Sequence, residues 1–355
     1  MKYKPDWDKV KQRYEAFWKN EIIDRAVFYV VAPKPGKKTV PVPKDPETRF
    51  TNEDYLFESG LASLEGTYWG ADALPELSAN VGLFAFPDCI FGGKPRYGET
   101  IWMERAFDSL ADPHATFDIN FANPYIIRQE RYLKRICEFA REKCLVHLPS
   151  CFGGLDCLSS LLGPEQLCLE LAEPTSKLRR ALSRTDAASM MLYERFRSIC
   201  AEKGVETTMF LPLWAPGRYV ALQCDFMVMI GKQHFLEYGM PSLRLFAAFA
   251  DHSLFHLDGA EATHHLDALL ACEELDGIQW QPGNDYDGPA PLEPWFPMLR
   301  KIQQAGKKIY VSCEAKHVEL VMKSLSSKGL FLASAANSEE EALALERLVA
   351  KLTHD

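Results

Sequence analysis

The chain has 355 residues, of which 47% are hydrophobic and 25% are charged, and its formal net charge is −9. This composition is typical of a globular protein with a large core, and the absence of a long basic run argues against nucleic-acid binding. No stretch approaches the roughly 18 continuous apolar residues that span a bilayer, and the charged N-terminus lacks a signal-peptide core. We therefore expect a cytoplasmic protein that binds a small molecule and neither nucleic acid nor a membrane.

Residues 8–20 predict a helix, which belongs to an N-terminal helical extension over residues 1–25. Short apolar runs follow and predict buried parallel strands over residues 26–32, 80–86, 144–150, 207–213, 253–258, 276–280, 307–312 and 329–334. Amphipathic stretches separate these runs, and two of them begin, at Pro164 and after Ser338, with residues typical of helix starts.

Eight strand-and-helix units predict a single (β/α)8 TIM barrel domain over residues 1–355. The segment 67–108 is the least regular part of the chain, and it is rich in aromatic residues. We predict that most of it forms a long loop or hairpin excursion near the mouth of the barrel, inserted in the N-terminal half. A lid, a homodimer contact, or both, are the open alternatives for its role. The ten cysteines are scattered without a C-x-x-C pair, so we expect most of them to be buried small hydrophobes.

Residues at the carboxyl ends of barrel strands line the mouth. The predicted strand ends are Pro33, Pro87-Asp88, residues 147–151, Trp214, residues 256–258, Gln279-Trp280, Cys313-Glu314 and residues 334–337. The sharpest feature among them is His256-Leu257-Asp258, because alternation along a strand places His256 and Asp258 on the same side. An imidazole and a carboxylate on one cavity can bind a metal, hold an anion or move a proton. The alternative is a structural His–Asp pair, or an Asp that caps the loop.

The loop after the predicted fourth strand carries Trp214, Arg218 and Asp225. The planar guanidinium of Arg218 suits a carboxylate or phosphate group, and Asp225 would orient a polar substrate or a catalytic partner. Alternatively, Arg218 and Asp225 pair with each other across a surface loop. Gln279 and Trp280 suit a planar ligand, unless Trp280 is a plug of the core.

Three further features predict structure more than chemistry. Residues 151–156 indicate a tight turn before a helix with Asp156 near its cap, in preference to a phosphate-binding loop. Cys313 ends the predicted seventh strand and is expected to be an inert buried thiol. His264 and His265 are expected on a helix surface.

Several of these segments together resemble the uroporphyrinogen decarboxylase-like superfamily, which includes corrinoid-dependent methyltransferases and is related to the barrel of cobalamin-independent methionine synthase. The matching segments run in order through nearly the whole chain: Asp24-Arg25, residues 153–156, 214–217 and 223–226, His234-Phe235 with Pro241, and residues 255–259, 278–280 and 282–283. The resemblance implies a (β/α)8 barrel with a deep mouth. Residues 32–38, where porphyrinogen decarboxylases carry an arginine-rich segment, contain lysines and no arginine.

The zinc methyltransferases of this superfamily use a His-x-Cys pair and a later Cys as metal ligands. The resemblance aligns His256 with the histidine and Asp258 with the first cysteine, and residues 334–337 contain no cysteine. It implies a metal at His256 and Asp258, with zinc as the hypothesis that the family suggests.

The leading hypothesis is a methyltransferase-type enzyme that moves a methyl group between a small methylated substrate and a corrinoid carried by a separate protein. We assign catalytic roles to Asp225, His256 and Asp258, and substrate binding to Trp214, Arg218, Gln279 and Trp280. His256 and Asp258 would bind the metal or act as acid and base.

Two alternatives stay open at this point. One is a decarboxylase or related lyase that acts on a polycarboxylate such as a porphyrinogen, held by Lys34, Lys37, Lys38 and Arg218. The other is a non-catalytic barrel that binds a ligand and for which His256 is dispensable.

Overall fold

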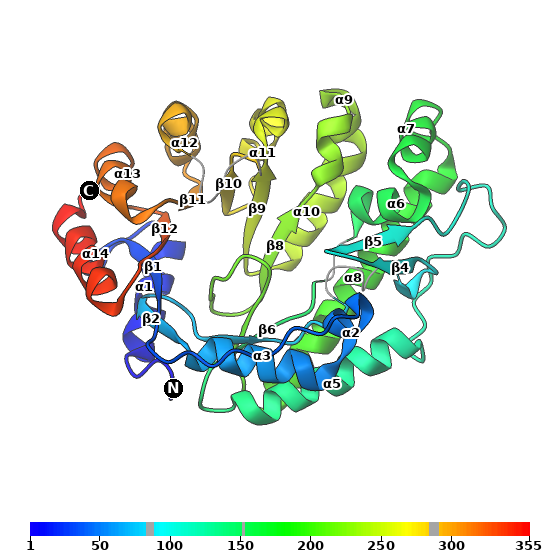
Figure 1. The fold of residues 1–355 in the computed structure, drawn as a ribbon. Helices are drawn as coiled ribbons and strands as arrows, with labels where there is room; N and C mark the ends of the chain where they lie inside the picture. Colours follow the sequence, from blue (N-terminus) through cyan, green and yellow to red (C-terminus); the bar gives the residue numbers. More distant parts are fainter. Residues whose placement is uncertain (83–88, 151–152, 284–290) are drawn as a thin grey trace.

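The computed structural model describes residues 1–355 except for 83–88, 151–152 and 284–290 (Figure 1). The chain has a mixed α/β fold built on a seven-stranded sheet with the order β2-β1-β12-β11-β10-β9-β8. Neighbouring strands of this sheet are parallel, apart from β1 and β2, which are antiparallel. A parallel three-stranded sheet, β3-β6-β7, and an antiparallel pair, β4-β5, account for the other strands of the described residues.

The strands of the large sheet are β1 (Val27–Pro33), β2 (Thr67–Ala71), β8 (Tyr219–Gln223), β9 (His252–Asp258), β10 (Gly277–Gln281), β11 (Lys308–Ser312) and β12 (Leu330–Ala335). The short strands are β3 (Glu76–Ser78), β6 (Leu145–His147) and β7 (Thr207–Thr208), and the antiparallel pair is β4 (Lys94–Tyr97) with β5 (Ile101–Glu104). The parallel strands of the large sheet are mostly buried, as near-continuous apolar runs predict.

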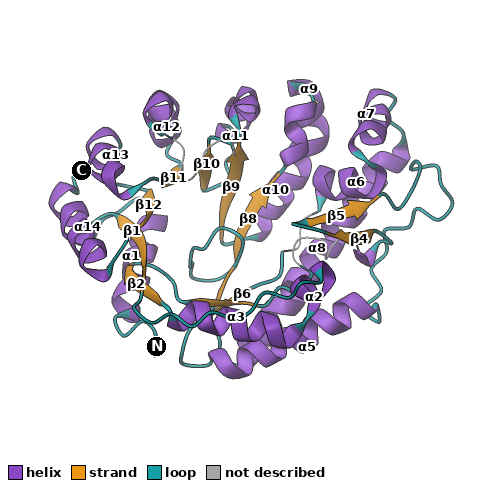
Figure 2. Cartoon of the chain, in the orientation of Figure 1, coloured by secondary structure: helices purple, strands orange, loops and turns teal. Residues whose placement is uncertain are grey.

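Helices cover the outside of the strands (Figure 2). They are α1 (Trp7–Trp18), α2 (Pro46–Thr51), α3 (Glu53–Glu65), α5 (Pro124–Ala140), α6 (Gly154–Leu162), α7 (Pro164–Ala172), α8 (Ser176–Glu202), α9 (Lys232–His234), α10 (Met240–Phe249), α11 (Leu266–Leu270), α12 (Phe296–Gln304), α13 (Val318–Ser324) and α14 (Glu339–Leu352). In the described part of the chain, none of the helices is long and apolar enough to cross a membrane.

Several predicted elements are confirmed. The N-terminal helix is α1, and the strands predicted from residues 26, 253, 276, 307 and 329 onward are β1, β9, β10, β11 and β12. The helix that starts at Pro164 is α7, with the proline in its first turn. Ser338 accepts a hydrogen bond from the backbone N–H of Glu341 and so caps α14.

The predicted fourth strand, residues 207–213, is wrong over most of its length. Only Thr207 and Thr208 are paired, as β7, and the chain then runs irregularly to a second strand, β8, which the sequence pattern does not predict. Pro212 and Pro216 interrupt the stretch because proline cannot donate to a ladder. Gly217 adds a turn at φ 88°. Residues 214–218 therefore lie before β8 and not after the carboxyl end of a strand that faces the site.

The N-terminal half also differs from expectation. The second parallel strand is β3, earlier than the predicted residues 80–86, whose last four residues lie outside the described part of the chain. The segment 67–108, predicted as a loop or hairpin excursion, begins with β2, which is paired with β1 in the large sheet and is no part of an excursion. Later in the segment, β4 and β5 form an antiparallel pair, as the hairpin alternative allows.

The register places particular side chains on one face of the large sheet. Gln223 is paired with His256, His256 with Gln279, and Gln279 with Tyr310, so these side chains point the same way. Tyr310 is paired in turn with Phe331, and alternation on β1 and β12 adds Tyr29 to the same face. We call this the inner face, because the opposite face packs against the helices.

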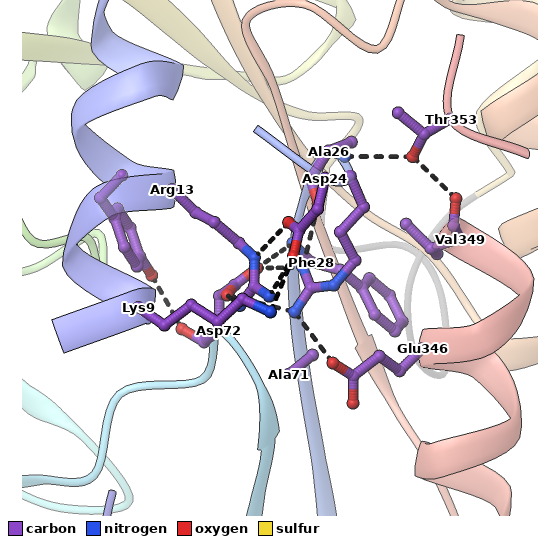
Figure 3. A network of polar contacts seen from close by, with 12 residues as sticks. Lys9, Arg13, Asp24, Ala26, Phe28, Ala71, Asp72, Glu346, Val349 and Thr353 are labelled. Carbon is purple, nitrogen blue, oxygen red and sulfur yellow. Dashed lines mark hydrogen bonds and ion pairs between the residues drawn. The ribbon is translucent and has the colours of Figure 1, made fainter. Parts of the chain in front are cut away.

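A buried polar network ties the start of the chain to its end (Figure 3). Asp72, which is 0% exposed, accepts hydrogen bonds from Arg13 of α1 at 3.0 Å, from Arg25, and from the backbone N–H of Phe28 at 3.0 Å. Arg25 also donates to Glu346 of α14 at 3.1 Å. The network therefore joins α1, β1, the end of β2 and α14.

Candidate functional site

The centre of the site is at the carboxyl end of β9, where His256 and Asp258 lie on the inner face. Their side chains are 13% and 29% exposed, and the His256 Nε2 lies 3.9 Å from the Asp258 Oδ2. Both residues fall in the part of the strand that the sequence predicts to be extended, so the expected same-side placement is confirmed.

Gln279 of β10 fixes the orientation of the His256 ring. The amide Nε2 of Gln279 donates to the carbonyl of Trp280 at 3.2 Å, which leaves its Oε1 as an acceptor beside the His256 Nδ1. The Nδ1–H of His256 therefore donates to Gln279, and the Nε2 lone pair points toward the side of Asp258. The ring of Phe210 packs edge-on against the imidazole, with 5.2 Å between the ring centroids.

Asp225 joins this pair from a different strand. It starts a 3-10 turn, residues Asp225–Met229, directly after β8. One ligand atom each from Asp225, His256 and Asp258 lie within 4.8 Å of one another. Asp225 was assigned a catalytic role from the sequence, and the structure brings it to the two β9 residues.

Asp156 positions this turn. Its two carboxylate oxygens accept hydrogen bonds from the backbone N–H groups of Asp225 and Phe226, at 3.0 and 2.9 Å. Asp156 lies in the first turn of α6, where the sequence predicts a helix cap, but the cap residue is Gly153 and Asp156 reaches across to the other segment. An acid two residues after Gly153-Gly154 is the sequence signal for this role.

The surroundings of the Asp225 and Asp156 carboxyl groups disfavour the charged form of both. Although Asp225 is exposed overall, burial among its neighbours, with the Asp156 and Asp258 carboxylates, raises its pKa to about 7. Burial also raises the pKa of Asp156, against the lowering effect of its hydrogen bonds with Phe226 and Asp225. Among the ion pairs of the described residues, none joins a Lys or Arg to these three carboxyl groups, so a bound cation would balance them.

Two of the predicted substrate-binding residues lie elsewhere. Trp214 packs edge-on against Trp7, with 5.6 Å between the ring centroids, and its carbonyl accepts a hydrogen bond from Trp18. The Arg218 guanidinium pairs with Glu194 at 2.5 Å and lies over the Phe249 ring. The structure therefore does not bring Trp214 and Arg218 to His256 and Asp258, because residues 214–218 precede β8 whereas Asp225 follows its end.

Trp280 is also outside the site. It follows Gln279 on β10 and so points to the opposite face, where it is 1% exposed and packs against Trp295 at 4.7 Å between centroids. The position of Trp280 fits the alternative interpretation, in which it is a plug of the core. Of the predicted Gln279-Trp280 pair, only Gln279 contacts His256.

Of two further predictions, for Cys313 and for His265, the structure agrees with the first and contradicts the second. Burial raises the pKa of the Cys313 thiol to about 12, so this cysteine is the inert thiol that was expected. His265 was predicted on a helix surface, but it is buried. Its Nε2 lies 2.9 Å from the carbonyl oxygen of Met227. It therefore anchors the far end of the turn that carries Asp225.

The donor set suits a divalent metal ion. One imidazole nitrogen and two carboxylates converge, and the Oδ1 of Asp258 is buried without a hydrogen-bond partner in the described structure. A metal-ligating histidine usually donates its other ring N–H to an oxygen acceptor, as His256 does with Gln279. Nitrogen and oxygen ligands of this kind are used for zinc at catalytic sites and for harder divalent ions.

No protein-family model matches the chain, and no curated protein matches its sequence.

Proposed function

We propose that the chain is a metal-dependent, methyltransferase-type enzyme with a (β/α)8 barrel fold. It would move a methyl group between a small methylated substrate and a corrinoid on a separate protein. The observation that carries the proposal is the convergence of Asp225 with His256 and Asp258, from two strands, at one end of the inner face.

The barrel is supported by contacts between the seven-stranded sheet and the three-stranded sheet. The sulfur of Met209, directly after β7, accepts a hydrogen bond from the backbone N–H of Ala221 of β8 at 3.2 Å. The two strands are therefore neighbours, although no backbone hydrogen-bond ladder joins them. Burial and, to a smaller extent, the Glu76 carboxylate of β3 raise the pKa of Tyr29 and of Tyr310, which is in accord with a position of Glu76 beside the inner face. Together, these contacts favour two sheets that enclose one interior.

In this proposal His256, Asp258 and Asp225 hold the metal, which would act as a Lewis acid on the group that gives up or accepts the methyl. Asp156 holds Asp225 in place through the backbone, and Gln279 accepts from the His256 Nδ1–H, so that the Nε2 would be the atom that binds the metal. Phe210 covers one edge of the imidazole and limits the access of water from that side.

The lyase alternative is less well supported by the geometry. It relied on Arg218 together with Lys34, Lys37 and Lys38 to hold substrate carboxylates. Arg218 instead pairs with Glu194 at the other end of β8. The non-catalytic alternative is distinguished by experiment, because it makes His256 dispensable.

Metal content is the first test. Purified wild-type protein, loaded with zinc and desalted, should retain about one equivalent by elemental mass spectrometry. His256→Ala and Asp258→Ala should lose it, because each removes one of three ligands, whereas the exposed His114→Ala should retain it.

The same preparations are then assayed for methyl transfer with a methylated corrinoid protein and a panel of small acceptors. We expect turnover by wild type that is abolished in metal-free protein. Equal metal content in all variants, or no transfer across a broad panel, would contradict the proposal. Lyase activity that survives metal removal would instead support the alternative.

A further inference from the structure

A second polar cluster lies on the three-stranded sheet. His147 is the last residue of β6, and its Nδ1 lies 3.2 Å from the Glu76 Oε1 of β3. The hydroxyl of Thr208, on β7, donates to the other oxygen of Glu76. Three neighbouring strands therefore each contribute one member of a Thr–Glu–His chain.

The hydrogen bonds determine which nitrogen of His147 carries the proton. The Glu76 carboxylate is an acceptor, so the Nδ1–H of His147 donates to it and the Nε2 bears a lone pair. Among the residues that the structure describes, none hydrogen-bonds to this Nε2, and the His147 side chain is 17% exposed. This is the arrangement of a general base whose orientation a carboxylate fixes.

In the proposed barrel, the cluster faces the same interior as the metal site. His147 is paired in register with Thr208, and two residues further along the chain the ring of Phe210 contacts His256. Glu76 acts electrostatically on Tyr29 and Tyr310, which share the inner face with His256 and Gln279. His147 also ends its strand, as His256 and Asp258 lie at the end of theirs.

We propose that His147 is the general base of this enzyme and acts on a small acceptor with an ionisable S–H or O–H bond. The bond breaks heterolytically, its electron pair stays on sulfur or oxygen, and the proton moves to the Nε2 of His147. Glu76 and Thr208 are positioning residues. The inference rests on the proposed function for the identity of the reaction, whereas the His147–Glu76 pair does not depend on it.

The tautomer of His147 is tested first, by proton–nitrogen NMR of protein labelled with 15N-histidine. The His147 signals, assigned by their loss in His147→Gln, should show a protonated Nδ1 and a bare Nε2. Glu76→Gln should change this pattern, and His114→Ala should not. A wild-type His147 that carries its proton on Nε2 would overturn the proposal, whatever the activity.

Turnover is tested second, with 2-mercaptoethanol and phenol as acceptors and a methylated corrinoid protein as donor. Since general-base catalysis is worth about 10²–10⁴-fold, His147→Gln should lose at least about 100-fold in kcat, keep its metal, and regain activity with added imidazole. Thr208→Val should lower kcat and Thr208→Ser should restore it. Full activity of His147→Gln would overturn the assignment. Absence of turnover by wild type would overturn the proposed function. The NMR experiment would still show whether the Nδ1 of His147 donates to Glu76.

Discussion

At the scale of single residues, the site depends on side chains that position the candidate metal ligands and are not themselves among those ligands. Asp156 sets the position of Asp225 through two backbone N–H groups, and Gln279 sets the ring of His256. Neither role follows from residue type. It follows from which atoms the neighbouring strands bring within hydrogen-bond distance, and partners of this kind typically change metal affinity by about 10–100-fold when they are removed.

Asp186 gives a residue-scale prediction that is independent of function. It lies on α8, accepts a hydrogen bond from the Ser242 hydroxyl at 2.6 Å, and burial raises its pKa to about 6 from an ordinary 3.8. The folded state therefore binds a proton more tightly than the unfolded state. The associated stability is present below about pH 4 and is lost as the pH rises through 6, by up to about 3 kcal/mol.

Asp186→Asn removes this titration and should keep the Ser242 contact. Urea unfolding of both proteins should show wild type losing stability relative to the variant between pH 4 and pH 7. Parallel pH profiles of the two unfolding free energies would contradict the raised pKa.

At the scale of elements, the sequence predicts best where apolar runs are long and unbroken. The strands β9, β10, β11 and β12 are of this kind, and the His256-x-Asp258 pair was found because it ends one of them. The fourth unit was predicted poorly, because Pro212 and Pro216 break the apolar pattern and β8 follows without an intervening helix.

That error explains most of the misplaced site residues. If residues 214–218 followed a strand, Trp214 and Arg218 would lie at the mouth, whereas they lie before β8. Trp280 was misplaced for a different reason, since strand alternation allows only one of Gln279 and Trp280 to face His256. The contacts of Asp156 with the Asp225 turn and of Glu76 with His147 join distant segments, 69 and 71 residues apart, and no local pattern reveals them.

At the scale of the whole molecule, the Asp72 network closes the fold between its two ends. Asp72 is buried and is held by Arg13, Arg25 and the Phe28 backbone, and Arg25 extends the contact to Glu346. Hydrogen bonds with Arg13 also lower the pKa of the neighbouring Asp24. Removal of one partner from such a buried network leaves uncompensated charge.

We therefore expect Asp72→Ala to lower the free energy of unfolding by at least about 3 kcal/mol in urea titrations. Asp267→Asn is the matched control, because its ion pair with Lys301 is exposed on both sides and should be worth at most about 1 kcal/mol. Equal effects of the two substitutions would show that the network does not hold the ends of the chain together.

The central claim is that Asp225, His256 and Asp258 hold one metal ion, and it is tested most directly by anomalous diffraction from crystals grown with zinc. We predict one strong anomalous peak at the carboxyl end of β9, about 2.0–2.2 Å from the His256 Nε2 and from an oxygen of each carboxylate. A formed site without a peak at saturating zinc, or zinc bound only elsewhere on the protein, would contradict the claim.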